Sequence, residues 1–172
     1  MSTCFLNREV CNLNLAEIKL QQKFVNDWQN ELQSVSKLRT YRSFKSDFNL
    51  EKYVTMDIPK PHRSILAQFR CGVLPIRIET GRFRGEEVND RLCIICSVEA
   101  IEDEFHFLLH CTSYSKLRTE FFTSIGFNNR SLNMSDSDCT GFLLSNFPRQ
   151  TAKFVYSAFM CRQSILYKNN NA

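Results

Sequence analysis

Apolar residues recur at helical spacing along most of the chain. Over residues 15–33 their spacing is near 3.6, which places them on one face of a helix: Leu15, Ile18, Phe24, Val25, Trp28 and Leu32. Similar spacing returns clearly in segments 62–72, 112–127 and 149–168, and more weakly after Ser36 and in segment 139–147. Pro59 and Pro61 interrupt the pattern, because they cannot both occupy a helix interior. The pattern predicts a mainly α fold, about six helices around one core, with little or no β structure.

Residues 73–85 do not follow this pattern. They combine short runs of β-branched residues with Pro75, Gly81 and Gly85. We interpret this segment as irregular or briefly extended.

The chain of 172 residues is long enough to bury a core of its own. We expect an N-terminal helical arm over residues 1–36, followed by a helical domain over residues 37–172. That domain contains a Cys/His-rich segment at 93–111, which we expect to form a small turn-plus-helix unit.

Composition limits the class of protein and the cellular location that we expect. A hydrophobic share of 43% with fifteen Phe excludes a compositionally disordered chain. No apolar run approaches the roughly twenty residues of a membrane span, so no membrane partner is expected. The first twenty residues lack a basic stretch followed by an apolar one, so we expect no secretory signal and an intracellular location, nuclear or cytoplasmic. In a reducing compartment, clustered cysteines are metal ligands or free thiols rather than disulfides.

Charge is unevenly distributed along the chain. Residues 92–111 carry four acidic and no basic side chains, whereas residues 37–91 carry twelve basic and seven acidic ones, and residues 112–172 carry seven and three. The Cys/His segment is therefore an acidic stretch between two basic flanks. Basic flanks suit a nucleic-acid partner, although a solvated helical surface would have the same composition.

The segment 93–111 has the spacing C-x2-C-x9-H-x4-C. Two residues between Cys93 and Cys96 allow a tight turn that directs both thiolates at one ion. His106 and Cys111, near the end of an expected helical turn, would complete a tetrahedral set of three sulfurs and one nitrogen. Such a closed set is typical of structural zinc, because it leaves no position for a reactive water. The sequence thus predicts Zn as a cofactor.

Three alternatives to this ligand set remain open. His110 competes with His106, although its neighbour Cys111 makes convergence on one ion harder. The segment could instead be a buried amphipathic helix with incidental thiols. A redox dithiol is disfavoured, because a redox C-x2-C usually lies beside a βαβ pattern, which is missing from the sequence around Cys93.

Motifs for catalysis are missing from the sequence. It contains no phosphate-binding G-x4-G-K-[ST] loop, no G-x-G-x-x-G and no G-x-S-x-G. It also has no hydrophobic-Asp-Asp pair of the kind that holds two polymerase metals. We expect the protein not to be an enzyme and to have no small-molecule substrate.

Four stretches together resemble the C-terminal tail of reverse transcriptases from animal non-LTR retrotransposons of the LINE type, jockey-like elements: "SKLRTYRSFKSDFNLEKYV", "HRSILAQFRCGVLPIRIETGRFRG", "RLCIICSVEAIEDEFHFLLHC" and "TAKFVYSAF". In that family a CCHC zinc-binding segment follows the polymerase. The resemblance covers roughly residues 28–167, and it implies metal ligands at Cys93, Cys96, His106 and Cys111. The polymerase body and its catalytic aspartates have no counterpart, so the resemblance implies zinc binding and contact with RNA or DNA, but no polymerisation. A reverse transcriptase body is a further partner that it implies.

Two hypotheses for function follow. In the first, a zinc-stabilised module contacts RNA or DNA phosphates through arginines of the basic flanks: Arg39, Arg42, Arg63, Arg70, Arg77, Arg82 and Arg84. In the second, the zinc-stabilised helical domain is a structural or protein-interaction remnant with no nucleic-acid role. A contiguous arginine face would favour the first hypothesis. Arginines dispersed in ion pairs with Glu51, Glu79, Glu86 and Glu87 would favour the second.

Overall fold

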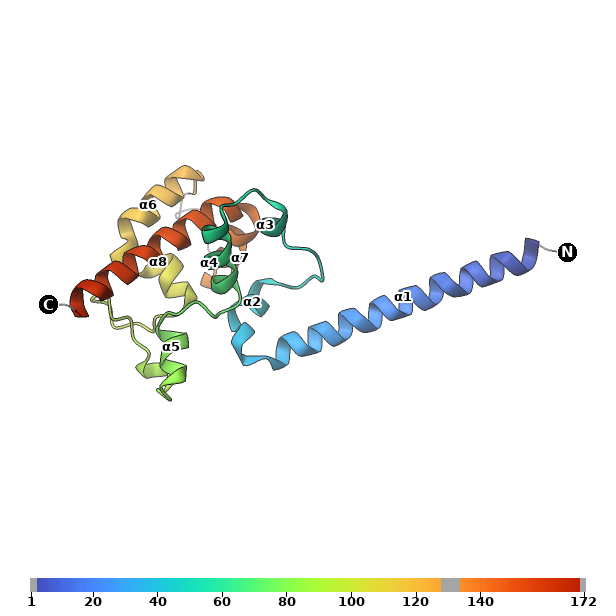
Figure 1. Cartoon of the computed structure of the whole chain (residues 1–172), viewed down its shortest axis with the longest axis horizontal. Coiled ribbons are helices and arrows are strands. Elements are labelled where there is room, and N and C mark those ends of the chain that lie inside the picture. Colours follow the sequence, from blue (N-terminus) through green and yellow to red (C-terminus); the bar gives the residue numbers. More distant parts are fainter. Residues whose placement is uncertain (1–2, 128–133, 171–172) are drawn as a thin grey trace. The chain divides into compact units, whose positions relative to one another are not determined.

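The computed structural model describes residues 3–127 and 134–170, and it describes side chains over residues 14–35, 37–127 and 134–168. By its internal contacts the chain divides into two compact units, residues 1–36 and 37–172. The first is the single helix α1 (Thr3–Ser34), drawn in blue in Figure 1. On it the apolar residues Leu15, Ile18 and Phe24 are exposed, whereas Leu32 is buried.

The second unit is built from α-helices: α2 (Arg39–Phe44), α3 (Lys52–Thr55), α4 (Lys60–Arg70), α5 (Arg77–Phe83), α6 (Ser115–Ser124), α7 (Asp136–Asn146) and α8 (Pro148–Asn170). Short 3₁₀ turns at Ser36–Leu38, Val88–Asp90 and Thr112–Tyr114, and a π-helix η3 at His106–His110, connect them. Extended pairing in the described residues is limited to one isolated antiparallel bridge, between Leu92 and Ile101. The predicted mainly α fold is confirmed.

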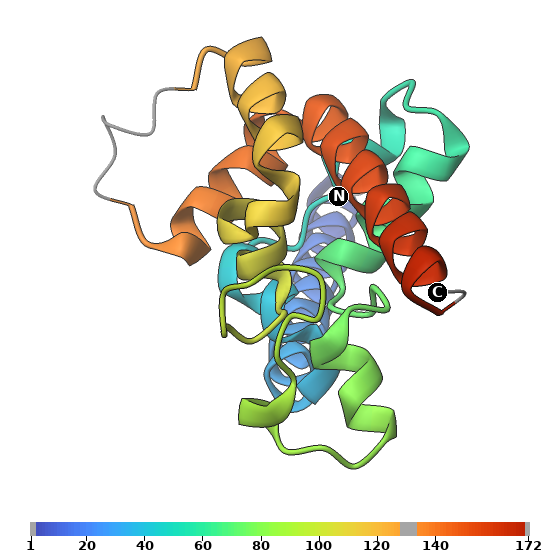
Figure 2. The same cartoon turned by 90° about the vertical axis from the view of Figure 1, so that its left-hand side faces the viewer.

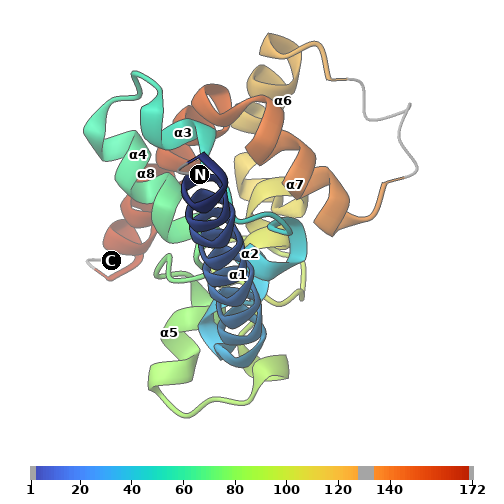
Figure 3. The same cartoon turned by 90° about the vertical axis from the view of Figure 1, so that its right-hand side faces the viewer.

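The core of this unit gathers around α8. This helix packs against α4, α6 and α7, and α2 packs against α7. Figure 2 shows α8 in red with α6 beside it, and Figure 3 shows α3 and α4 on the other side of α8. Phe154, Val155 and Ala158 of α8 are buried, as the spacing of its apolar residues requires.

The two ends of α4 follow from its sequence. Pro59 is the N-cap residue and Pro61 lies in the first turn, where a missing N–H costs no helical hydrogen bond. Gly72 follows the C-cap residue with φ +66°, a conformation that favours glycine. A Cβ at this position would lie 2.6 Å from the carbonyl oxygen of Lys37.

The interpretation of residues 73–85 as irregular is wrong for Arg77–Phe83, which form helix α5, whereas residues 73–76 and 84–85 are outside any helix. Its first turn is held by groups distant in sequence: Arg77 N–H donates to Glu102 Oε2 at 2.9 Å, and Arg91 Nη1 donates to the Ile78 carbonyl at 2.9 Å. Gly81 is needed for close packing here, since a Cβ would lie 2.7 Å from Arg91 Cγ. Tertiary contacts thus outweigh a weak local helix signal.

Of the helices described, none has both the length and the apolar character that a bilayer crossing requires.

Candidate metal centre

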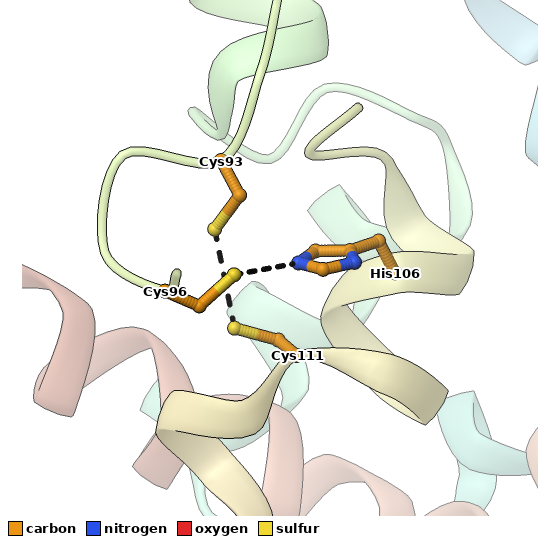
Figure 4. A group of neighbouring side chains, drawn as sticks. All are labelled: Cys93, Cys96, His106 and Cys111. Carbon is orange, nitrogen blue, oxygen red and sulfur yellow. Dashed lines mark hydrogen bonds between the residues drawn. The ribbon is translucent and has the colours of Figure 1, made fainter. Parts of the chain in front are cut away.

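Four potential metal ligands converge within the second unit. The ligand atoms of Cys93, Cys96, His106 and Cys111 all lie within 4.8 Å of one another. Figure 4 shows the three sulfurs and the imidazole of His106 pointing toward a common centre. The first two come from the loop after α5, and the last two come from the start and the end of η3. Cys93, His106 and Cys111 are buried, and Cys96 is partly exposed.

The spacing of these atoms fits a tetrahedral zinc ion. Zn–S bonds of about 2.3 Å and a Zn–N bond of about 2.0 Å place two sulfurs about 3.8 Å apart, and a sulfur and a nitrogen about 3.5 Å apart. The Sγ atoms of Cys93 and Cys111 are 4.0 Å apart, and Cys96 Sγ lies 3.5 Å from His106 Nε2. These two separations are close to the zinc values, so the four side chains could hold this metal.

The π-helix explains how His106 and Cys111 reach the same centre. In a regular α-helix, five residues turn the chain by about 500°, which would leave the two side chains about 140° apart. Here the Cys111 N–H donates to the His106 carbonyl at 2.7 Å, which closes an i→i+5 turn. This wider turn brings the two residues to one side of the helix, as π-turns at functional sites often do.

The rival ligand His110 lies outside the cluster. Its side chain is 52% exposed, and its Nε2 lies 2.8 Å from Asp136 Oδ2 of α7. His106, in contrast, is 5% exposed and faces Cys96. The geometry therefore favours His106 as the fourth ligand.

Two hydrogen bonds to backbone groups hold the Cys93–Cys96 turn in place. Cys93 N–H donates to the Ala100 carbonyl at 2.8 Å, next to the bridge between Leu92 and Ile101. Ser113 Oγ donates to the Ile95 carbonyl at 2.5 Å, which joins this turn to the segment after Cys111. The turn is thus attached on both sides by bonds that need no metal.

The pKa values of the Cys93 and Cys111 thiols are shifted in opposite directions. A hydrogen bond to Cys111, together with burial, raises the pKa of Cys93 to about 12. The same hydrogen bond lowers the pKa of Cys111. Either sulfur of this pair could hold the shared proton. A divalent cation would take the place of that proton, because only thiolates ligate.

Each acidic residue of the run 102–104 has a separate structural role. Glu102 accepts from both Arg162 of α8 and the Arg77 N–H of α5. Asp103 Oδ1 accepts from the backbone N–H of His106 at 2.8 Å. Glu104 accepts from Arg39 and Thr40 at 2.7 and 2.9 Å. The Cys/His segment 93–111 is therefore joined to three helices, α8, α5 and α2.

Arg118 of α6 stabilises the carbonyl end of η3. It is 8% exposed, and it donates to the carbonyls of Leu108 and Cys111 at 2.8 and 2.9 Å. Carbonyls at a buried helix end need such donors, because no further helical turn supplies them. Arg118 thus fixes the backbone of a candidate ligand.

The arginines predicted for phosphate contact are mostly engaged in ion pairs. Arg70 pairs with Glu51, Arg82 with Glu79, and Arg39 with Glu104, while Arg77 and Arg84 both lie near Glu86. Arg42 and Arg63 are half-buried on α2 and α4. Among the seven, Arg70 is only 2% exposed, whereas the side chain of Arg84 is 69% exposed.

Sequence reasoning missed the roles of Glu102, Arg118 and Arg162. One signal was available, because Arg162 falls on the apolar stripe of the last helix. An arginine at such a position needs a buried acidic partner. Nothing in the sequence identified Glu102 as that partner.

Comparison of the chain with protein-family models, with curated proteins and with solved structures gives no match. Functional conclusions therefore rest on the arrangement of the side chains described above.

Proposed function

We propose that this protein is a non-catalytic, zinc-stabilised helical domain in which Cys93, Cys96, His106 and Cys111 bind one zinc ion. The observation that carries the proposal is the convergence of these four ligand atoms within 4.8 Å, with two of their separations close to those of a tetrahedral zinc site. Three sulfurs and one imidazole are soft ligands, which favour zinc over magnesium or calcium. The role is structural because all four positions would be taken by the protein.

The metal would join parts of the fold that are distant in sequence. It would tie the Cys93–Cys96 turn to both ends of η3. That segment is itself attached to α2 through Glu104 and to α8 through Glu102. Zinc binding would therefore stabilise the packing of the whole second unit, and not only the loop that carries the ligands.

Ion pairing of the arginines favours the structural or protein-interaction hypothesis over phosphate binding along the basic flanks. Of the seven candidate arginines, five have a glutamate partner within 4.0 Å. Three of those glutamates, Glu51, Glu79 and Glu86, belong to the set that would favour dispersed pairing. The likeness to retrotransposon reverse-transcriptase tails stays a proposal about ancestry.

A second candidate function is contact with single-stranded RNA or DNA at the end of α5. Phe83 is 74% exposed there, and the guanidinium of Arg82 lies 4.8 Å from the centre of its ring. Arg84 beside it is also largely exposed. An exposed aromatic ring between two cations is suited to base stacking and phosphate contact.

Two measurements separate these functions. For the structural role, thermal unfolding is followed with zinc and with an excess of chelator. We expect the chelated protein to lose its cooperative transition or to melt many degrees lower.

For the second candidate, RNA and DNA are titrated over a salt series. The proteins are the wild type, the double variant Phe83→Ala/Arg84→Ala and the control Arg149→Ala, which changes an exposed position on α8. Nucleic-acid contact at α5 requires salt-dependent binding that only the double variant weakens.

A further inference from the structure

The four ligand side chains of the proposed zinc site differ in their access to solvent. Cys93, His106 and Cys111 are 8%, 5% and 1% exposed, whereas Cys96 is partly exposed. The three residues that follow Cys96, at 97–99, are all exposed. Cys96 is therefore the ligand that a small reagent in solution reaches most easily.

The ligand sulfurs also differ in the backbone groups around them. The backbone N–H of Ile95 donates to the sulfur of Cys93, and that of Ser113 donates to the sulfur of Cys111. Cys96 Sγ instead lies 3.6 Å from the carbonyl oxygen of Val98. An N–H donor stabilises the negative charge of a thiolate and lowers its nucleophilicity, whereas a carbonyl oxygen does neither.

The thiolate form of cysteine is the form that reacts with oxidants and electrophiles. Binding to a divalent cation would hold the sulfur of Cys96 in that form. Burial raises the pKa of Cys71 and that of Cys139, so these two thiols, which lie outside the cluster, stay protonated at neutral pH. Cys96 thus combines the reactive form with access from solvent, which buried structural cysteines lack.

We propose that Cys96 is a peroxide-sensitive modification site, through which oxidation releases the metal from this domain. The inference rests on the proposed zinc site. The Cys96 thiolate attacks one oxygen of hydrogen peroxide, the O–O bond breaks, and the hydroxide that leaves takes up a proton to form water. Sulfur loses two electrons and peroxide gains them, so Cys96 becomes a sulfenic acid.

Two neighbouring sulfurs complete the reaction. The ligand atoms of Cys93 and Cys111 lie within 4.8 Å of that of Cys96, and Figure 4 shows all three sulfurs around one centre. One of these thiols attacks the sulfenic sulfur of Cys96, a disulfide forms, and the hydroxyl group leaves with the thiol proton as water. A disulfide removes two of the four ligands together, so the metal is released, and reduction by a thiol restores the site.

The test is oxidation of the zinc-loaded full chain by hydrogen peroxide. Zinc release is followed with a chromophoric indicator, and early samples are alkylated, digested and mapped by mass spectrometry. The variant is Cys96→His, which replaces the accessible sulfur by a nitrogen ligand, and the control is Cys161→Ser, outside the cluster. Zinc content is measured before peroxide is added, so failure of the zinc site itself is distinguished from failure of this inference.

We expect every early disulfide within residues 93–111 to contain Cys96. Cys161→Ser should release zinc at the wild-type rate, and Cys96→His should release it about tenfold more slowly, because the sulfurs that remain are buried. The inference is overturned if a disulfide between Cys93 and Cys111 forms first, if peroxide releases no zinc, or if Cys96→His releases zinc as fast as the wild type. If Cys96→His binds no zinc, the disulfide map of the wild type decides.

Discussion

Arg162 and Glu102 form a buried, bidentate ion pair between α8 and the Cys/His segment 93–111. Arg162 Nε donates to Glu102 Oε1 at 2.7 Å, and Nη2 donates to Oε2 at 2.8 Å. Their side chains are 4% and 1% exposed. Because Glu102 lies four residues before His106, the pair fixes the approach of the chain to η3 from outside the ligand set.

Removal of one partner from this pair should destabilise the protein strongly. Arg162→Met leaves the Glu102 carboxylate buried without its main donor, and we expect a loss of about 3–5 kcal/mol in the free energy of unfolding. Urea denaturation measures it, with Arg149→Met as the control at an exposed position on the same helix. The double variant Arg162→Met/Glu102→Met should recover part of the loss. An Arg162→Met protein as stable as the control would contradict the account.

The identity of the fourth ligand can be tested with two histidine variants. His106→Ala should lose the zinc ion, because the nitrogen nearest to the sulfurs is removed. His110→Ala should keep a full complement of zinc, since His110 contacts Asp136 instead. Zinc content after gel filtration distinguishes the two. Retention by His106→Ala with loss by His110→Ala would mean that the ligand assignment is reversed.

Arg118 should affect metal affinity without touching the metal. In Arg118→Met the carbonyls of Leu108 and Cys111 lose their donor, and the backbone of one ligand is released. We expect zinc affinity to fall about 10–100-fold, which is typical for groups that orient ligands. Competition with a chromophoric chelator measures this affinity. Lys116→Met, at an exposed position two residues away, is the control and should bind zinc as the wild type does.

Glu51 should contribute to stability at neutral pH and lose this contribution in acid. Burial alone would raise the pKa of its carboxyl, but donors from Lys45 and Arg70 outweigh burial and lower it. A carboxyl whose pKa is lower in the folded state stabilises the fold above its unfolded pKa, about 4.5, and ceases to do so as pH falls through the folded value.

The measurement is the difference in unfolding free energy between wild type and Glu51→Gln at pH 6 and at pH 3. Loss of zinc in acid affects both proteins, so it cancels in this difference. We expect the difference to shrink at pH 3. A difference that stays constant or grows would show that the Glu51 carboxylate is not what Arg70 and Lys45 stabilise.

The cluster of Cys93, Cys96, His106 and Cys111 could be predicted from the sequence because its geometry is local. Cys93 and Cys96 are separated by a turn, and His106 and Cys111 by one turn of helix, so spacing alone restricts where their side chains point. The choice between His106 and His110 was harder. It depends on the π-turn and on Asp136 of α7, and neither has a local signal.

The buried ion pairs could not be predicted in the same way. Arg162 and Glu102 are 60 residues apart, and Arg39 and Glu104 are 65 apart. Many acidic residues lie at comparable distances along the sequence, and only the tertiary fold selects among them. Helix α5 was missed for a related reason, since its first turn is held by Glu102 and Arg91, which are distant in sequence.

The most direct test of the account is the zinc content of the protein purified without added metal, measured together with that of Cys96→Ser. Cys161→Ser is the matched control, because Cys161 is a partly exposed cysteine outside the cluster. We predict one zinc per chain in the wild type and in Cys161→Ser, with loss of the metal and partial unfolding in Cys96→Ser. A wild type without zinc, together with a Cys96→Ser protein that folds normally, would contradict a structural zinc site.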